Sequence, residues 1–352
     1  MVDKEYCMSS YLALRYIEAD DKDFFPGLHH RNISAPWKDH TYPVKTAADI
    51  DKIIMDQLSA LKDEKLGLLL SGGMDSAILA SYMRGCDAYT FRFLNGAYQK
   101  EELQRAEYYA KYYGLTLHYV DVSWETTVEP YLEPLMRAKA APVHSIEPQI
   151  MQAALQAKAD GITMMIIGNG SDYVFGGMDQ LLSQDWPFHS FIERYSFLKP
   201  EDVLVNPVDM SYLFERYRTG NNIDFLKFME CISTSESFAS YQNAFFTTNL
   251  LYLDPYACMK MAEPLDLPRV RSGESKYLIR ELFSQKYPGI PIPEKVPMPR
   301  PVDNYFQDWD GPVRYEFKQN LDISSFSGNQ KWQLYCLEQF LNLYEPKIDC
   351  AV

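Results

Sequence analysis

The segment 66–84 constrains the fold most, because it joins a short apolar run to a glycine-rich turn and then to a helical pattern. The run LGLLL (66–70) has the length and composition of a β-strand buried on both faces. SGGMDS (71–76) follows at once, and AILASYMR (77–84) then predicts a helix. A strand buried on both faces belongs inside a sheet, so this segment places its turn at the end of an interior strand.

The same alternation of strand and helix recurs through the first half of the chain. Apolar, β-favouring runs at 87–93, 115–122 and 162–168 predict three further strands. Helical spacing predicts helices over 47–64, over 101–114 with its end at Gly114, and over 146–161 with its end at Gly161. Strands that alternate with helices form parallel β-α-β units with right-handed crossovers. The sequence therefore predicts an α/β fold with a parallel sheet.

The rest of the chain shows less strand pattern. Residues 1–45 form an N-terminal segment that we expect to be aromatic and loop-like, with prolines and a glycine along it. After about Trp186 the strand signal fades, and helical patterns follow at 191–198, 210–218, 222–232, 275–287 and 330–344. No repeat or long linker divides these parts. We therefore predict one domain over 46–345, with an α/β core at 46–185 and a mainly helical part at 186–345.

Composition and charge limit the partners. The 352 residues are 47% hydrophobic and carry a net charge of 34 − 48 = −14. Acidic surfaces disfavour nucleic acid and anionic membranes, so we expect neither as a partner. The N-terminus lacks a signal pattern and no run is long enough to span a membrane, which predicts a cytoplasmic protein. The six cysteines contain no C-x-x-C pair and predict neither a zinc site nor a disulfide framework.

The turn Ser71–Gly72–Gly73–Met74–Asp75–Ser76 has the chemistry of a phosphate site. Two glycines let a phosphate approach the backbone, and the amides at the start of the following helix point toward an anion. The serine hydroxyls add donors. Asp75 would repel phosphate unless it holds Mg²⁺, which bridges the oxygens. The turn is not a Walker loop, because it lacks G-x-x-x-x-G-K-[ST].

This turn resembles the pyrophosphate loop of the N-type ATP pyrophosphatases, the PP-loop superfamily with an adenine nucleotide alpha-hydrolase-like, Rossmann-like core. The resemblance implies ATP and Mg²⁺ as ligands and cleavage of ATP between its α and β phosphates, with a substrate activated as an adenylate. The residues it implies for ATP and pyrophosphate are Leu70, Ser71, Gly72, Gly73, Asp75, Ser76, Phe91, Gly168, Gly170 and Lys276. Leu70 and the strand 89–93 would lie near adenine.

A second glycine-rich motif, GNGSDYVFGG at 168–177, follows a predicted strand and carries one acid, Asp172. Ligands of parallel sheets collect at the carboxyl ends of strands, so Asp75 and Asp172 are predicted to hold one Mg²⁺ between them. The motif is similar to the S-G-E-G-S-D-E-x-F-G-G segment of asparagine synthetase and β-lactam synthetase. It narrows the resemblance to that branch of the superfamily.

A third match lies late in the chain. GESKYLIR (273–280) resembles the family's K-x-x-L-R helix, and Lys295 occupies the place of the lysine in its late R-x-K segment. The resemblance makes Lys295 a catalytic residue that neutralises charge as pyrophosphate leaves. Lys276, Arg280 and Arg300 are weaker candidates for a place in the same site, because each is explained equally well as a surface charge. The proline-rich segment 295–308 is expected to be either the mouth that selects substrate or a rigid loop.

Two departures from the family matter. Asn169 replaces the glutamate of S-G-E-G-S-D, and an amide cannot accept a proton as a general base does. Asn169 is therefore predicted to orient a substrate, while another base or a neutral nucleophile is needed; Tyr173, Glu147, His144 and Asp179 are the candidates. The expected ATP loop also begins after only about 65 residues, and Cys7 is no N-terminal nucleophile. We therefore expect the synthetase domain without a glutaminase domain.

The leading hypothesis is an ATP-dependent, AMP-forming carbon–nitrogen ligase. It would adenylate a small carboxylate and transfer it to ammonia or an amine, supplied directly or by a separate ammonia source. Two alternatives stay open: a PP-loop RNA-modifying enzyme, which the acidic charge disfavours, and a degenerate nucleotide-binding regulator that lost its base. A homo-oligomer is also left open.

Overall fold

The computed structural model describes residues 1–31, 41–94, 100–294 and 301–345. Its centre is a five-stranded sheet in which every neighbouring pair is parallel, in the order β4-β3-β2-β5-β8. The strands are β2 (Leu66–Leu69), β3 (Asp87–Phe93), β4 (Thr116–Val122), β5 (Met164–Ile166) and β8 (Leu251–Leu253). The predicted α/β class with a parallel sheet is confirmed.

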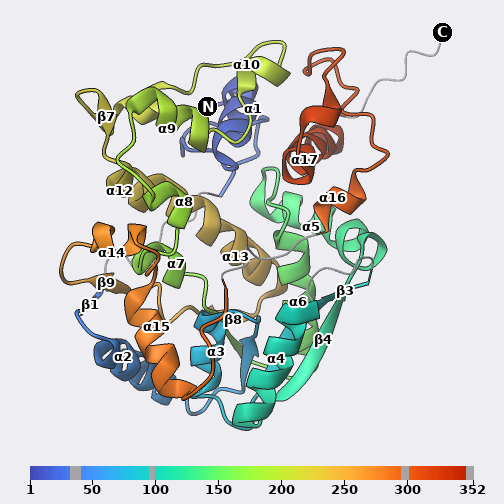
Figure 1. The fold of residues 1–352 in the computed structure, drawn as a ribbon. Helices are drawn as coiled ribbons and strands as arrows, with labels where there is room; N and C mark the ends of the chain where they lie inside the picture. The colour runs from blue at the N-terminus through green and yellow to red at the C-terminus, as the bar shows by residue number, and fades with distance from the viewer. Residues whose placement is uncertain (32–40, 95–99, 295–300, 346–352) are drawn as a thin grey trace.

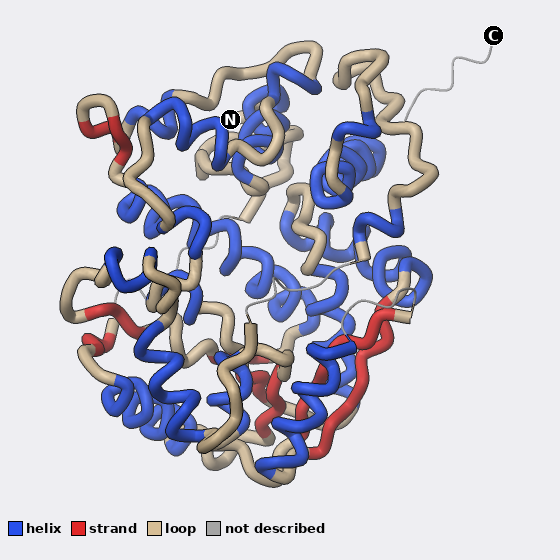
Figure 2. The backbone as a smooth tube through the Cα atoms, in the orientation of Figure 1, coloured by secondary structure: helices blue, strands red, loops and turns tan. Residues whose placement is uncertain are grey.

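Helices cover the sheet on both faces, as Figures 1 and 2 show. One face carries α2 (Ala47–Ser59), α3 (Met74–Ala80), α4 (Lys100–Tyr113) and α15 (Tyr277–Lys286). The other carries α5 (Glu129–Lys139), α6 (Glu147–Ala159) and α13 (Thr234–Thr248). Successive strand residues enter opposite layers: Met165 belongs to one buried cluster and Ile166 to the other. A strand that is buried on both faces explains the continuous apolar runs.

The remaining elements gather mostly beyond α13, at the top of Figure 1. The helices there are α1 (Lys4–Leu14), α9 (Phe188–Tyr195), α10 (Pro200–Val203), α11 (Tyr212–Glu215), α12 (Phe225–Phe228), α16 (Val302–Tyr305) and α17 (Gly328–Tyr344). Shorter pieces are α7 (Ser171–Val174), α8 (Asp179–Leu182), α14 (Leu267–Arg271), the parallel pair β1 (Tyr42–Val44) and β9 (Met259–Met261), and the hairpin β6 (Arg218–Thr219) and β7 (Asn222–Ile223). Two π-helical turns, Trp124–Val128 and Met229–Ser233, and a 3₁₀ turn, Ile323–Ser325, complete the described elements.

Local sequence signals explain several helix boundaries. Thr46 caps α2 in a capping box with Asp49, in which each side chain bonds the other residue's backbone N–H. Gly114 and Gly161 follow α4 and α6 with φ of +72° and +82°, a conformation that costs glycine little. Both predicted helix ends are therefore confirmed.

The sequence patterns missed several elements, including the helix α5, which contains Pro130 and Pro134 and so does not read as a helix. The N-terminal segment is not loop-like throughout, because α1 buries every residue from Tyr6 to Leu14 and so shows no one-sided pattern. The helix α13 is rich in serine and threonine and is buried around much of its surface. The strand β8 has only three residues and lies in the part expected to be helical. The sheet thus takes its last strand from beyond residue 186.

No helix in the described ranges is both long enough and apolar enough to cross a lipid bilayer.

A buried ion pair ties three helices together on one face of the sheet. Lys139 of α5 donates to Oε1 of Glu147 on α6 at 2.8 Å, and their side chains are 4% and 0% exposed. Asn243 of α13 donates to Oε2 of Glu147 at 2.7 Å, and the backbone N–H of His144 donates to Oε1 at 2.8 Å. Removing one partner would leave a buried charge without compensation.

We therefore expect Lys139→Met to lower the free energy of unfolding by about 3–5 kcal/mol. Arg137→Met is the matched control, because Arg137 lies on the same helix in an exposed pair with Glu133 and should change stability little. Urea denaturation of both variants measures the difference. Equal effects would show that the buried pair does not stabilise the helical layer.

Candidate active site

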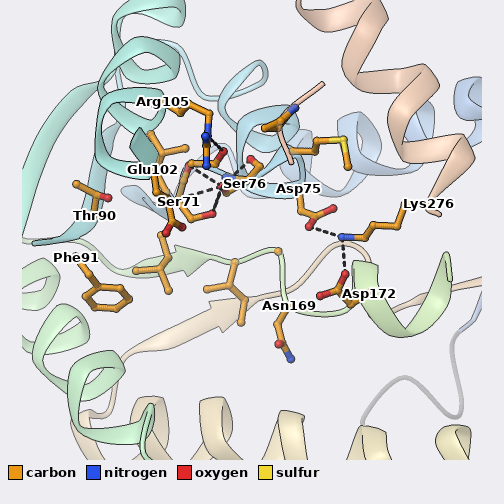
Figure 3. A pocket seen from close by; sticks show the side chains of 18 of the residues that line it. Ser71, Asp75, Ser76, Thr90, Phe91, Glu102, Arg105, Asn169, Asp172 and Lys276 are labelled. Atoms are coloured by element: carbon orange, nitrogen blue, oxygen red, sulfur yellow. Dashed lines mark hydrogen bonds and ion pairs between the residues drawn. The ribbon is translucent and has the colours of Figure 1, made fainter. Parts of the chain in front are cut away.

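A cavity of about 210 Å³ lies where the central strands end, lined by the segments that follow β2 and β5. Figure 3 shows these side chains facing one another across it. The residues of the predicted site that line it are Leu70, Ser71, Gly72, Gly73, Asp75, Ser76, Phe91, Gly168, Asn169, Asp172 and Lys276. Four separate stretches of sequence thus meet at one cavity, although their roles remain predictions.

The serine-rich turn is held in shape by its own side chains. Ser76 Oγ accepts a hydrogen bond from the Ser71 backbone N–H at 3.0 Å, and the two hydroxyl oxygens are 3.0 Å apart. The N–H of Gly73 donates to Ser71 Oγ at 3.1 Å. The turn therefore presents hydroxyl and amide groups from a fixed backbone, as a phosphate-binding loop requires.

Two glycines allow the close approaches that shape this cavity. A Cβ on Gly72 would lie 2.5 Å from the backbone oxygen of Glu102, at the start of α4. A Cβ on Gly168 would lie 3.3 Å from Cβ of Asp75, so this glycine brings the second motif against the first. Gly170 does not line the cavity: it packs on the segment after β8, where its Cβ would lie 2.7 Å from the Ala257 nitrogen.

Three charged groups meet on one side of the cavity. The Lys276 ammonium lies 2.6 Å from Asp75 Oδ2 and 2.7 Å from Asp172 Oδ1. Ser171 Oγ donates to the other Asp75 oxygen at 2.6 Å. Burial alone would lower the pKa of Lys276, but the charges of Asp75 and Asp172 outweigh it and raise this pKa above its ordinary value of 10.5. Lys276 is therefore charged at neutral pH.

The carboxylates fit a magnesium ion in their chemistry. Their oxygens converge on one point, now taken by the ammonium, and carboxylate oxygens are the ligands Mg²⁺ prefers. Within the described ranges no third histidine, cysteine or acid joins them to complete a metal centre. The remaining ligands of a bound Mg²⁺ would therefore be phosphate oxygens and water, as is usual for nucleotide sites.

Asn169 lies opposite the charged cluster and points away from it (Figure 3). Its Oδ1 accepts a hydrogen bond from Ser237 Oγ of α13 at 3.1 Å. Its Nδ2 is buried and has no hydrogen-bond partner in the described structure. A buried donor without a partner costs free energy, which a bound oxygen atom would recover.

None of the four candidate bases lines the cavity. Glu147 is held by Lys139 and Asn243, and His144 Nε2 lies 3.2 Å from Glu236. Asp179 is exposed on α8. Tyr173 is more than half buried, and burial first, then the charge of Glu236, raises its pKa above the ordinary value of 10.0. These observations give none of the four a direct contact with a substrate in the cavity.

The structure also brings in residues that sequence patterns did not single out. Arg105 of α4 lines the cavity and donates to the carbonyl of Gly72 at 3.0 Å, and Tyr241 of α13 lines the cavity too. Ser275 lines it as well, and so does Arg280, which the sequence had already offered as a weaker candidate. The spacing of Arg105 within an ordinary amphipathic helix carries no signal of its role, because only the packing of α4 on Gly72 brings it here.

Asp254 was also missed, although the sequence does indicate it. It directly follows a short apolar run, LLYL, and an acid in that place marks the carboxyl end of a strand. It accepts hydrogen bonds from the backbone N–H groups of Gly170 at 2.6 Å and Tyr256 at 3.2 Å. It therefore holds the second motif in place. Burial, with a smaller contribution from Asp75, raises the pKa of this carboxyl to about 7.

Some predicted residues cannot be placed. Lys295 and Arg300 lie outside the described residues, and of the segment 295–308 the structure describes only 301–308. Of the strand expected near adenine, Thr90 and Phe91 line the cavity. Tyr89 does not, and its hydroxyl instead donates to Asp160 at 2.9 Å.

Comparison with known proteins supports one family. The model of the asparagine synthase family matches residues 51–238, which is more than half of the chain and includes both glycine-rich motifs. No curated protein matches the chain significantly.

Two solved structures are similar at low identity. The NMN synthetase from Francisella tularensis is 18% identical, over 38% of this chain and 60% of that one, with a TM-score of 0.27. The U34-tRNA thiolase NcsA from Methanococcus maripaludis is 12% identical, over 86% of this chain and 80% of that one, with a TM-score of 0.29. The chain thus spans less than two thirds of the NMN synthetase.

The raised pKa of Asp254 predicts a pH-dependent stability. Below its ordinary pKa of 3.8 both states hold the proton; between 3.8 and about 7 only the folded state does. This contribution to stability is therefore lost as pH rises through about 7. Asp254→Asn does not titrate, so the unfolding free energy of the wild type should fall relative to that variant between about pH 5.5 and about pH 8.

Chemical denaturation at both pH values measures this difference. Asp56→Asn, an exposed position on α2, is the control and should follow the wild type. A difference between wild type and Asp254→Asn that stays constant with pH would contradict the assignment.

Proposed function

Because the chain belongs to the asparagine synthase family, we propose that it is an ATP-dependent carbon–nitrogen ligase that releases AMP and pyrophosphate. The observation that carries the proposal is the single cavity at the carboxyl edge of the sheet. The turn 71–76, Asp172, Lys276 and Asn169 all line this cavity. We assign the turn and Lys276 to the phosphates and the Asn169 amide to the acid.

The first step of the proposed reaction is adenylation. A carboxylate oxygen of the substrate attacks the α-phosphorus, the new P–O bond forms, and the bond to the β-phosphate oxygen breaks so that pyrophosphate leaves. The hydroxyls of Ser71 and Ser76 and the amides of their turn bind the departing phosphates. Lys276 and Arg105 offset the negative charge that grows there, and Lys295 is proposed to do the same.

The second step forms the amide. The nitrogen of ammonia or an amine attacks the acyl carbon, the C–N bond forms, and the C–O bond to AMP breaks. The nucleophile must lose a proton, and Asn169 cannot accept it. The released phosphate oxygens or water would take this proton, or the nucleophile would arrive neutral.

Asp75 and Asp172 would hold the magnesium of bound ATP, which would screen the phosphate charge. The substrates we propose are a small carboxylate and ammonia or an amine, drawn from solution or from a separate ammonia source. We propose no nucleic-acid or membrane partner, in keeping with the net charge of −14.

The decisive test follows labelled ATP. Wild-type protein incubated with α-labelled ATP, magnesium and a panel of amino acids, uronic acids and β-amino acids should release AMP and pyrophosphate with at least one acid. Release of ADP and phosphate instead would overturn the mechanism. Binding of ATP with no pyrophosphate release from any acid would favour a nucleotide-binding regulator.

Ser76→Ala should reduce the rate of pyrophosphate exchange by roughly ten- to a hundredfold, because it removes a hydroxyl that binds a charged phosphate. Ser81→Ala is the matched control: Ser81 lies at the other end of α3, and its hydroxyl donates to the carbonyl of Ile78. If both variants exchange pyrophosphate at the wild-type rate, the turn does not bind the phosphates.

Asn169→Ala tests the substrate side of the cavity. We propose that Nδ2 donates to an oxygen of the acid, so its removal should raise the KM for the acid by about tenfold and leave the KM for ATP nearly unchanged. The KM for ATP serves as the internal control. Equal changes in both constants would place Asn169 outside the acid site.

A further inference from the structure

We propose that Lys276 is a tethered cation that keeps divalent metal away from Asp75 and Asp172 until a nucleotide binds. This inference rests on the proposed use of magnesium ATP, because the two carboxylates are the metal ligands of that proposal. It adds an order to the binding events: nucleotide and metal enter together, and metal alone is excluded.

The ammonium of Lys276 occupies the point between the two carboxylates where a metal ion would bind. Its distances to the two carboxylates, 2.6 and 2.7 Å, are those of strong charged hydrogen bonds. The Lys276 side chain is 5% exposed, whereas Asp75 and Asp172 are 22% and 33% exposed. The lysine therefore enters from the protein side, and the carboxylates retain access to the cavity.

The backbone around Lys276 is shaped for this position. Lys276 has φ of +55° and ψ of +38°, a left-handed conformation that costs a residue with a side chain about 1 kcal/mol or more. Lys276 is the N-cap residue of α15 and does not use its side chain to cap that helix. The surrounding contacts hold Lys276 in this strained backbone conformation.

Gly177 makes the space for the pair. A Cβ at this position would lie 2.1 Å from Asp172 Oδ1 and 2.8 Å from Lys276 Cε. The observed positions of Asp172 and Lys276 therefore require a residue without a side chain at 177.

An ammonium and a magnesium ion cannot share the same carboxylate oxygens. Mg²⁺ binds oxygen at about 2.0–2.1 Å, so an ion on the two oxygens that accept from Nζ would lie close to the ammonium and be strongly repelled. Metal binding therefore requires Lys276 to move. A triphosphate supplies the reason to move, because its oxygens offer the ammonium a new anionic partner inside the same cavity.

The experiment measures Mn²⁺ binding directly, by its electron paramagnetic resonance signal, and needs no turnover. Wild-type protein alone should bind Mn²⁺ weakly, and a non-hydrolysable ATP analogue should tighten binding strongly. Lys276→Met should bind Mn²⁺ without nucleotide more than about tenfold tighter than wild type, because the competing charge is gone. Lys276→Arg keeps the charge and should resemble the wild type.

A double variant and the melting temperature distinguish a metal effect from a folding effect. Lys276→Met with Asp172→Asn should lose the gained affinity, because one of the two ligands is gone. Mn²⁺ without nucleotide should raise the melting temperature of Lys276→Met and leave that of the wild type unchanged. If Lys276→Met does not fold, Lys276→Gln removes the charge while keeping a polar side chain, and its Mn²⁺ affinity without nucleotide decides instead.

Mn²⁺ binding to the wild type that is equally tight with and without the analogue would overturn the inference, as would unchanged Mn²⁺ affinity in a folded Lys276→Met. Neither readout depends on AMP formation. A protein that excludes free metal but releases no pyrophosphate would therefore contradict the proposed reaction and leave the role of Lys276 standing.

Discussion

The ion cluster of Asp75, Lys276 and Asp172 is the interaction on which the architecture of the site depends. It joins the start of α3, the helix α7 and the start of α15, three segments that are far apart in the sequence. The buried ammonium is tolerable because it lies between two carboxylates, and the one net negative charge of the cluster stands on side chains that are partly exposed. The glycines at 168 and 177 exist at these positions because any side chain there would force the cluster apart or crowd it.

The helix α13, which packs behind the site, also places polar side chains where buried polar groups need partners. The helix α13 crosses the interior and supplies Ser237 to Asn169, Tyr241 to the cavity wall and Asn243 to the buried Glu147. A helix that makes polar contacts on several sides needs polar residues at buried positions. In α13 these buried positions include Ser240, Asn243 and Thr248. Its composition thus follows from its position between the sheet and the upper helices.

Elements with one-sided or fully apolar patterns were predictable, and elements without them were not. The strands β2 to β5 and the helices α2, α4 and α6 each carry a regular pattern over enough residues to be recognised. The helix α1 is buried all round, α13 is polar and buried, and β8 is three residues long, so none has a periodic signal. Much of the site was predictable because its motifs are local: a turn, an acid after a strand, a lysine before a helix.

The sequence by itself determined the parallel α/β class, the two glycine-rich turns and the chemistry of their side chains, because these depend on residues adjacent along the chain. Only the tertiary structure decided that an ammonium, and no third acid among the described residues, completes the Asp75–Asp172 pair. It also decided that Arg105 and Tyr241 line the cavity and that Asp254 holds the second turn. These contacts join residues from separate elements, and the distance between such residues is set by packing and not by their spacing in the sequence.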